Sequence, residues 1–280
     1  MPNNCFQLGQ IIVTDYICSM KLAISGKGGV GKSTIAAGIS ILLAEERKKV
    51  LAVDADPDAN LAAALGFTKN EQDQIVPISR QVELIEERTG AKVNQYGQIF
   101  TLNPDVSDIA ARYASSKRGV ALLVLGAVKR GGGGCACPEN VLIRALVGDL
   151  ILNKEETLIM DMEAGLEHLG RATTSGVDAM LVVVEPGQRS LDGAHRIEEM
   201  AHDIGLSNLY FVANKVVGAE DKNYIRETMA ERPVLEYIPF SEQIRKADRP
   251  GLSVLDNPDP EVIASLKNIL HQLRAPVSVS

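Results

Sequence analysis

Residues 26–33 read Gly26-Lys27-Gly28-Gly29-Val30-Gly31-Lys32-Ser33, which matches the phosphate-binding pattern G-x-x-x-x-G-K-S/T. The apolar run at residues 22–25 predicts a buried strand before this loop, and residues 34–47 predict a helix after it. Glycines let backbone N–H groups crowd around phosphate oxygens, which the helix N-terminus also attracts. We therefore expect an ATP/ADP site in which Lys32 neutralises the β- and γ-phosphates and the Ser33 hydroxyl binds Mg²⁺. The residues expected to contact the nucleotide from this segment are Gly28, Gly29, Val30, Gly31, Lys32, Ser33 and Thr34.

The bulk composition limits the class of protein. The chain has 280 residues, 45% of them hydrophobic, so it can bury a sizeable core and is not a disordered chain. A net charge of −7 argues against nucleic acid or an anionic membrane as the main partner. The longest apolar run, residues 120–128, is too short to cross a bilayer. Four cysteines without a secretory signal suit the reducing cytoplasm, where we expect this protein.

Short runs rich in Val, Ile and Leu recur along the chain, each followed by a helical pattern. Such near-continuous apolar runs are typical of strands covered on both faces, so we predict a doubly wound, mostly parallel α/β sheet with helices on both faces. We expect a single ATPase domain over residues 20–280, because the first strand begins directly at Met20. Residues 1–19 would then be an N-terminal extension. The predicted strands cover residues 22–25, 50–53, 121–125, 157–160, 179–184, 209–213 and 234–238.

Carboxylates follow two of these strands. Parallel sheets bind ligands at the carboxyl ends of their strands, so we expect one face to carry the phosphate-binding loop together with Asp54, Cys135, Asp161, Glu185 and Asn214. Asp161 ends an apolar strand and would contribute to the Mg²⁺ site with Ser33. Asp56 is the candidate for orienting or deprotonating the attacking water. The alternative for each is an ordinary solvated loop carboxylate.

A second motif is the stretch Gly131-Gly132-Gly133-Gly134-Cys135-Ala136-Cys137-Pro138. Pro138 suits the first turn of a helix, whose N-terminus would lower the pKa of both thiols and favour metal ligation. One Cys-x-Cys pair supplies only two of the four ligands of a closed Zn²⁺ site, and a two-fold dimer would supply the rest. Ni²⁺ also accepts thiolates. The alternatives are two incidental small hydrophobic residues or a disulfide, which ring strain disfavours.

The loop carries one lysine more than the pattern requires, Lys27, and in this it resembles the deviant Walker A motif of the ParA/MinD and nitrogenase iron-protein ATPases. The resemblance implies a homodimer in which Lys27 reaches the partner's nucleotide, as an arginine finger would. The alternative is a lysine that serves only its own subunit. By the same resemblance Asp56 corresponds to the catalytic aspartate of the first switch, Asp161 begins the second switch, Asn214 and Lys215 lie at the adenine, and Pro239 flanks the base.

With Cys135 and Cys137, the chain resembles the CooC-type accessory ATPases of carbon monoxide dehydrogenase. This implies an ATP-dependent homodimer that binds Ni²⁺ or Zn²⁺ and serves nickel insertion into the Ni-Fe-S cluster of its client. Acetyl-CoA synthase is an alternative client. An iron–sulfur electron donor is an alternative function, although residues 162–171 lack the second cysteine of the nitrogenase iron protein. A membrane or DNA scaffold is a third, but the apolar stripe within residues 262–273 carries few basic residues and favours packing on the sheet. His168 after the second switch is a structural residue, a sensor of the nucleotide or a residue that contacts the metal, and the structural role is favoured.

Overall fold

The computed structural model describes residues 19–274 except residues 94, 96, 128–136, 165–168, 170, 231, 249–251 and 254, and it does not describe the side chains of residues 171, 172 and 248. Cys135, the four-glycine run before it and His168 lie outside the described residues. So does the predicted extension at residues 1–19, apart from Ser19. The predictions for these residues remain untested.

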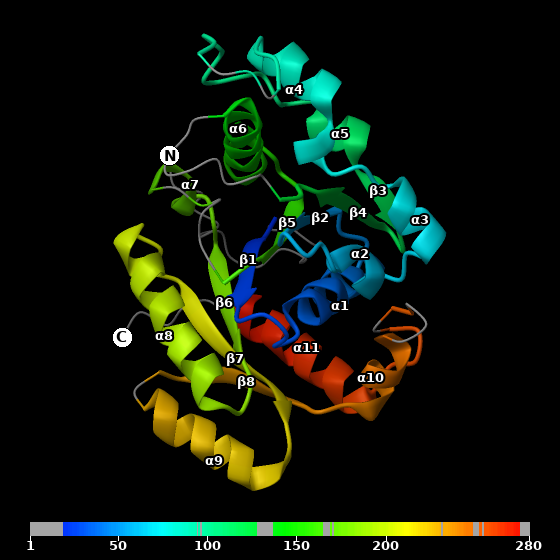
Figure 1. Cartoon of the computed structure of the whole chain (residues 1–280). Helices are drawn as coiled ribbons and strands as arrows, with labels where there is room; N and C mark the ends of the chain where they lie inside the picture. Colours follow the sequence, from blue (N-terminus) through cyan, green and yellow to red (C-terminus); the bar gives the residue numbers. More distant parts are fainter. Residues whose placement is uncertain are drawn as a thin grey trace, which may run out of the picture.

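An eight-stranded sheet forms the centre of the described chain, in the order β3-β4-β2-β5-β1-β6-β7-β8 (Figure 1). Only β3 runs antiparallel to its neighbour, and all other described pairings are parallel. The fold prediction is therefore confirmed. The strands are β1 (Lys21–Gly26), β2 (Val50–Ala55), β3 (Ser115–Lys117), β4 (Val120–Val124), β5 (Thr157–Met162), β6 (Ala179–Val184), β7 (Leu209–Val216) and β8 (Val234–Pro239).

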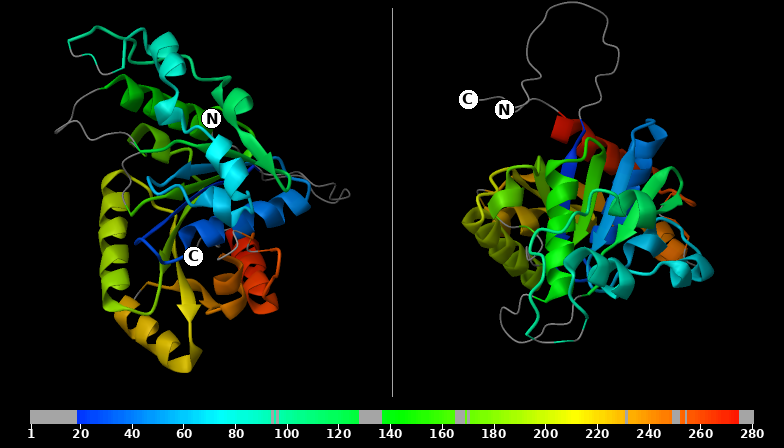
Figure 2. Two further views of the ribbon diagram at one scale, coloured as in Figure 1. Left: turned by 45° about the vertical axis from the view of Figure 1, so that its right-hand side comes forward. Right: turned by 90° about the horizontal axis from the view of Figure 1, so that it is seen from above.

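Helices cover both faces of the sheet, as Figures 1 and 2 show, because the central strands are apolar on both sides. Helices α1, α2 and α11 pack in one apolar layer. Helices α4, α5, α6, α8 and α9 pack in the other. The described helices are α1 (Lys32–Glu45), α2 (Leu61–Ala64), α3 (Lys69–Gln74), the 3-10 helix η1 (Ile78–Arg80), α4 (Val82–Thr89), α5 (Ile109–Tyr113), α6 (Pro138–Leu152), α7 (Arg171–Thr174), α8 (Gln188–Asp203), α9 (Gly218–Met229), α10 (Glu242–Asp248) and α11 (Pro260–Arg274).

The apolar stripe predicted near the C-terminus packs inward. Val262, Leu266, Ile269 and Leu270 of α11 are buried, and the helix lies against α1 and β8. This outcome agrees with the packing interpretation of the stripe. Among the described helices, none has both the length and the apolar character that crossing a bilayer requires.

The segment between β2 and β4 departs most from the sequence-based expectation. It contains α2 to α5 and β3, none of which the sequence pattern specified. Strand β3 reads Ser-Ser-Lys and has no apolar alternation, so only its pairing with β4 identifies it. Short helices such as α3, whose residues are all at least partly exposed, likewise lack a continuous apolar face.

Candidate functional site

The phosphate-binding loop joins β1 to α1 and requires glycine at two positions. Gly26 has φ 149° and Gly31, which precedes α1, has φ 98°, conformations that residues with a side chain rarely adopt. A Cβ atom at Gly26 would collide with the Val183 carbonyl oxygen on β6, and one at Gly31 would collide with the Asn214 side-chain amide on β7. Strands β6 and β7 therefore pack directly against the loop and restrict its conformation.

Two buried carboxylates lie beside each other at the carboxyl ends of β2 and β5. Asp54 and Asp161 are register partners on these parallel strands, and neither is exposed to solvent. Burial raises the pKa of Asp54 to about 8, and the nearby Asp161 contributes in the same direction. Burial likewise raises the pKa of Asp161 to about 6, partly offset by the Ser33 hydroxyl and by Lys32.

Asp161 fits a divalent-cation site. Both carboxylate oxygens are buried and have no hydrogen-bond partner within normal distance among the described residues. The Ser33 hydroxyl faces the same carboxyl closely enough to lower its pKa. A buried carboxylate with so little hydrogen bonding is costly unless a cation compensates it, and oxygen ligands are those Mg²⁺ prefers. Ser33 and Asp161 therefore suit Mg²⁺ bound with a nucleotide.

The candidate catalytic carboxylate lies next to the loop lysine. Lys32 Nζ is 3.4 Å from Asp56 Oδ2, and both side chains are largely buried. Asp54 holds the segment after β2 in place, because its two oxygens accept hydrogen bonds from the backbone N–H of Asp56 at 3.2 Å and of Leu61 at 2.9 Å. Asp56 thus occupies a defined position at the phosphate loop, as orienting a water requires.

Lys27 lies in the phosphate-binding loop, close to α8. Its Cβ faces α8, since a methyl group added at Gly193 would lie 3.8 Å from it. The side chain is partly exposed, and its ammonium group makes no ion pair or hydrogen bond with the residues that the structure describes. By contrast Lys32 and Lys215, the other lysines at this loop, both have partners.

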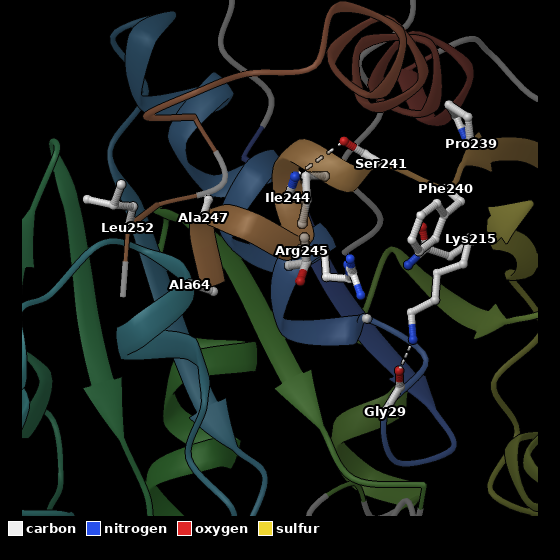
Figure 3. A pocket seen from close by; sticks show the side chains of 13 residues that line it. Gly29, Ala64, Lys215, Pro239, Phe240, Ser241, Ile244, Arg245, Ala247 and Leu252 are labelled. Atoms are coloured by element: carbon white, nitrogen blue, oxygen red, sulfur yellow. Dashed lines mark hydrogen bonds between the residues drawn. The ribbon is translucent and has the colours of Figure 1, made fainter. Parts of the chain in front are cut away.

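A cavity of about 360 Å³ adjoins the loop (Figure 3). Its walls come from the loop, from the end of β7, from the last residue of β8 and the two residues that follow it, and from α10 and Leu252. Asn214 lines the cavity, and its side-chain Nδ2 donates to the Val30 carbonyl oxygen at 2.8 Å, so its Oδ1 is left as an acceptor. The lining residues are Gly29, Gly31, Thr34, Ala64, Asn214, Lys215, Pro239, Phe240, Ser241, Ile244, Arg245, Ala247 and Leu252.

The structure thus brings together the predicted nucleotide residues of the loop with Asp56, Asp161, Asn214, Lys215 and Pro239. Sequence analysis did not assign a role to Arg245, Leu252 or Ala64, because they come from segments that reach the cavity only through the fold. It also assigned Asp54 no role. The signal was present, since Asp54 directly follows an apolar strand, but only the structure shows its two backbone contacts.

Cys137 is the described member of the Cys-x-Cys pair. It is the residue before the first turn of α6, with Pro138 at the first helical position as expected. The prediction that the helix N-terminus lowers the pKa of this thiol is wrong. Burial raises the pKa of the Cys137 thiol, with Glu139 adding to the rise, and the hydrogen bond with the Asn140 backbone opposes it only in part.

The fold and the loop define the chain as a P-loop nucleotide-binding protein. It belongs to the CobQ/CobB/MinD/ParA nucleotide binding domain family, whose sequence model matches residues 21–254 of this chain.

Two relatives cover nearly the whole chain. The chain is 43% identical to the carbon monoxide dehydrogenase accessory protein CooC of Rhodospirillum rubrum, over 85% of this chain and 90% of that protein. It is 41% identical to an uncharacterized ATP-binding protein of Methanocaldococcus jannaschii, over 91% of this chain and 99% of that protein. The resemblance to CooC-type proteins is confirmed.

Solved structures support the fold. A ParA family ATPase from Chlorobium tepidum matches with a TM-score of 0.66 at 20% identity, over 91% of this chain and 99% of that one. The septum site-determining protein MinD from Pyrococcus horikoshii, complexed with Mg-ADP, matches with a TM-score of 0.58 at 20% identity, over 91% of this chain and 96% of that one.

Proposed function

We propose that this protein is an ATP-hydrolysing homodimer that binds Ni²⁺ or Zn²⁺ and assists nickel insertion into carbon monoxide dehydrogenase. The observation that carries this proposal is the 43% identity to CooC, which is named an accessory protein of that enzyme, over 90% of its length. The site adds support, because the described part of the chain offers a complete phosphate loop, an unpaired buried carboxylate and a lysine without a local partner.

The hydrolysis proposal assigns a task to each described side chain. Lys32 and the loop N–H groups bind the β- and γ-phosphates, while Asp56, beside Lys32, orients a water for attack on the γ-phosphorus. The bond from that phosphorus to the β–γ bridging oxygen breaks, which yields ADP and phosphate. Mg²⁺, held through Ser33 and Asp161, supplies positive charge to the phosphates when it is bound. The free Oδ1 of Asn214 suits the amino group of adenine.

Lys27 supports the dimeric part of the proposal. Hydrolysis develops negative charge on the phosphates, and a cation from a partner subunit stabilises it. The ammonium group of Lys27 makes no contact that would hold it in its own subunit among the described residues. Catalysis would then depend on nucleotide-promoted association of two chains.

The metal is the cargo of this proposal. Cys135 and Cys137 of each chain supply two thiolates, so two chains related by a two-fold axis complete a four-thiolate site. Burial raises the pKa of the Cys137 thiol, so binding of a metal cation would have to displace the thiol proton. Relaxation of the two switches after hydrolysis would loosen the dimer and release the metal to the client.

A titration of Ni²⁺ with and without a non-hydrolysable ATP analogue tests this coupling. If one dimer geometry completes both sites, nucleotide and metal must change each other's affinity by the same factor. Equal nickel affinities in the two conditions would refute it. Iron and sulfide analysis of anaerobically purified protein separates the alternative, since a stoichiometric cluster would make the protein an electron donor. Activation of apo carbon monoxide dehydrogenase against apo acetyl-CoA synthase distinguishes the two clients.

A further inference from the structure

Lys215 has an unusual backbone conformation. It lies in β7 with φ 59°, in the left-handed region that a long side chain rarely occupies. The pairing of β7 with β8 is also irregular here, with a register shift between Ala213 and Val216. Such strain persists where the surrounding structure requires it, and it concentrates at functional sites.

The conformation has a consequence for side-chain direction. Successive side chains in a regular strand point to opposite faces, so Asn214 and Lys215 would diverge. In this structure both side chains reach the phosphate loop instead. The interrupted register and the left-handed residue break the alternation and let the two neighbours converge.

The two side chains bind consecutive carbonyl groups of the loop. Lys215 Nζ donates to the Gly29 carbonyl oxygen, as Figure 3 shows, and Asn214 Nδ2 donates to the Val30 carbonyl oxygen at 2.8 Å. Glu185, directly after β6, holds the lysine from the other side, with Oε2 at 3.2 Å from Nζ. The carbonyls of Gly29 and Val30 are thereby held toward β7 by donors from that strand.

We propose that Lys215 is a positioning residue that preorganises the phosphate loop, with Glu185 orienting it. A loop that binds phosphate through its N–H groups must keep its carbonyl groups away from the anion. Lys215 does this for Gly29 as Asn214 does for Val30. The proposal rests on the nucleotide site and is independent of the metal and the client, so its test leaves the metal proposal untouched.

The test compares Lys215→Met with a matched control, Lys222→Met, in the full-length protein. Lys222 is an exposed lysine on α9 that contacts only the Tyr237 ring through its ammonium group among the described residues. Binding of ADP with Mg²⁺ is measured by isothermal titration. A lost charge-assisted hydrogen bond predicts about five- to tenfold weaker binding for Lys215→Met and no change for Lys222→Met. In steady-state ATP hydrolysis KM should rise by the same factor while kcat changes little, as expected for an interaction present in both the ground and transition states.

Two further variants separate positioning from folding. Lys215→Gly relieves the left-handed strain but removes the side chain, so it should bind ADP as weakly as Lys215→Met while melting no lower. Glu185→Gln leaves the lysine in place and should weaken ADP binding by a smaller factor. Wild-type ADP affinity in Lys215→Gly or Lys215→Met would overturn the proposal. So would a loss of ADP affinity that is equally large in Lys215→Met and in the control Lys222→Met.

Discussion

Replacing Asp161 with Asn should stabilise the nucleotide-free protein while it abolishes Mg²⁺-dependent hydrolysis. Asp161 is fully buried, without a hydrogen-bond partner for either oxygen among the described residues, and its pKa is raised from 3.8 to about 6. At pH 8, above both values, the carboxylate is charged in both states, and its burial lowers the stability of the folded protein by about 3 kcal/mol. The Asp161→Asn substitution would remove this penalty and also the negative charge that raises the pKa of Asp54.

The sign of the pH dependence follows from the direction of the shift. As the pH falls through 6, the folded state takes up a proton before the unfolded state, so the penalty shrinks to about half at pH 5. Urea unfolding without nucleotide and in EDTA should therefore show Asp161→Asn more stable by about 3 kcal/mol at pH 8 and by roughly half as much at pH 5. The exposed Asp73, which pairs only with Lys69 on the same helix among the described residues, supplies the control Asp73→Asn, with a change within about 0.5 kcal/mol. Destabilisation of Asp161→Asn at pH 8, or a gain that is the same at both pH values, would refute the reasoning.

Three further predictions concern the loop and its neighbours. Lys27→Ala should bind ADP normally but lose both ATP hydrolysis, measured by phosphate release, and ATP-dependent dimerisation, measured by light scattering. A variant that hydrolyses ATP at the wild-type rate as a monomer would exclude the role of Lys27 in the partner's site. Gly31→Ala should lower the free energy of unfolding by more than about 1 kcal/mol and prevent nucleotide binding, because the backbone here has φ 98° and the added methyl group would collide with the Asn214 amide. A melting temperature and an ADP affinity like those of the wild type would contradict this prediction. Asn214→Ala should lower the free energy of unfolding by about 1–3 kcal/mol, because the buried Val30 carbonyl loses its donor, and it should reduce the preference for ATP over GTP in competition binding. Unchanged selectivity would show that Asn214 does not contact the base.

The sheet could be predicted because its strands carry their own signal. Continuous Val, Ile and Leu runs identify β1, β2, β4 to β8 and their parallel arrangement, since each run must be covered on both faces. Strand β3 and the short helices α3 and α5 could not be predicted in this way. Their residues are stabilised by pairing or by distant contacts, such as the ion pair of Lys117 with Glu71, rather than by an apolar period.

In the candidate site, too, residues marked by a local sequence pattern could be predicted, whereas residues brought in by the fold could not. Gly31, Lys32, Asp56 and Asp161 were predictable because a motif or a strand end fixes where each of them lies. Arg245 reaches the cavity from a helix far along the sequence, and no local pattern marks it. The pKa of the Cys137 thiol was mispredicted for a related reason, because the helix N-terminus is visible in the sequence but the burial that outweighs it is not.

The central claim is that two chains share one metal through Cys135 and Cys137 when nucleotide holds them together. Metal content of the wild type against the Cys135→Ala/Cys137→Ala variant, both saturated with Ni²⁺ and a non-hydrolysable ATP analogue and then desalted, tests it most directly. We expect about one Ni²⁺ per two chains in the wild type and none in the variant. Nickel retained by the variant at the wild-type level, or bound by wild-type monomers, would contradict it.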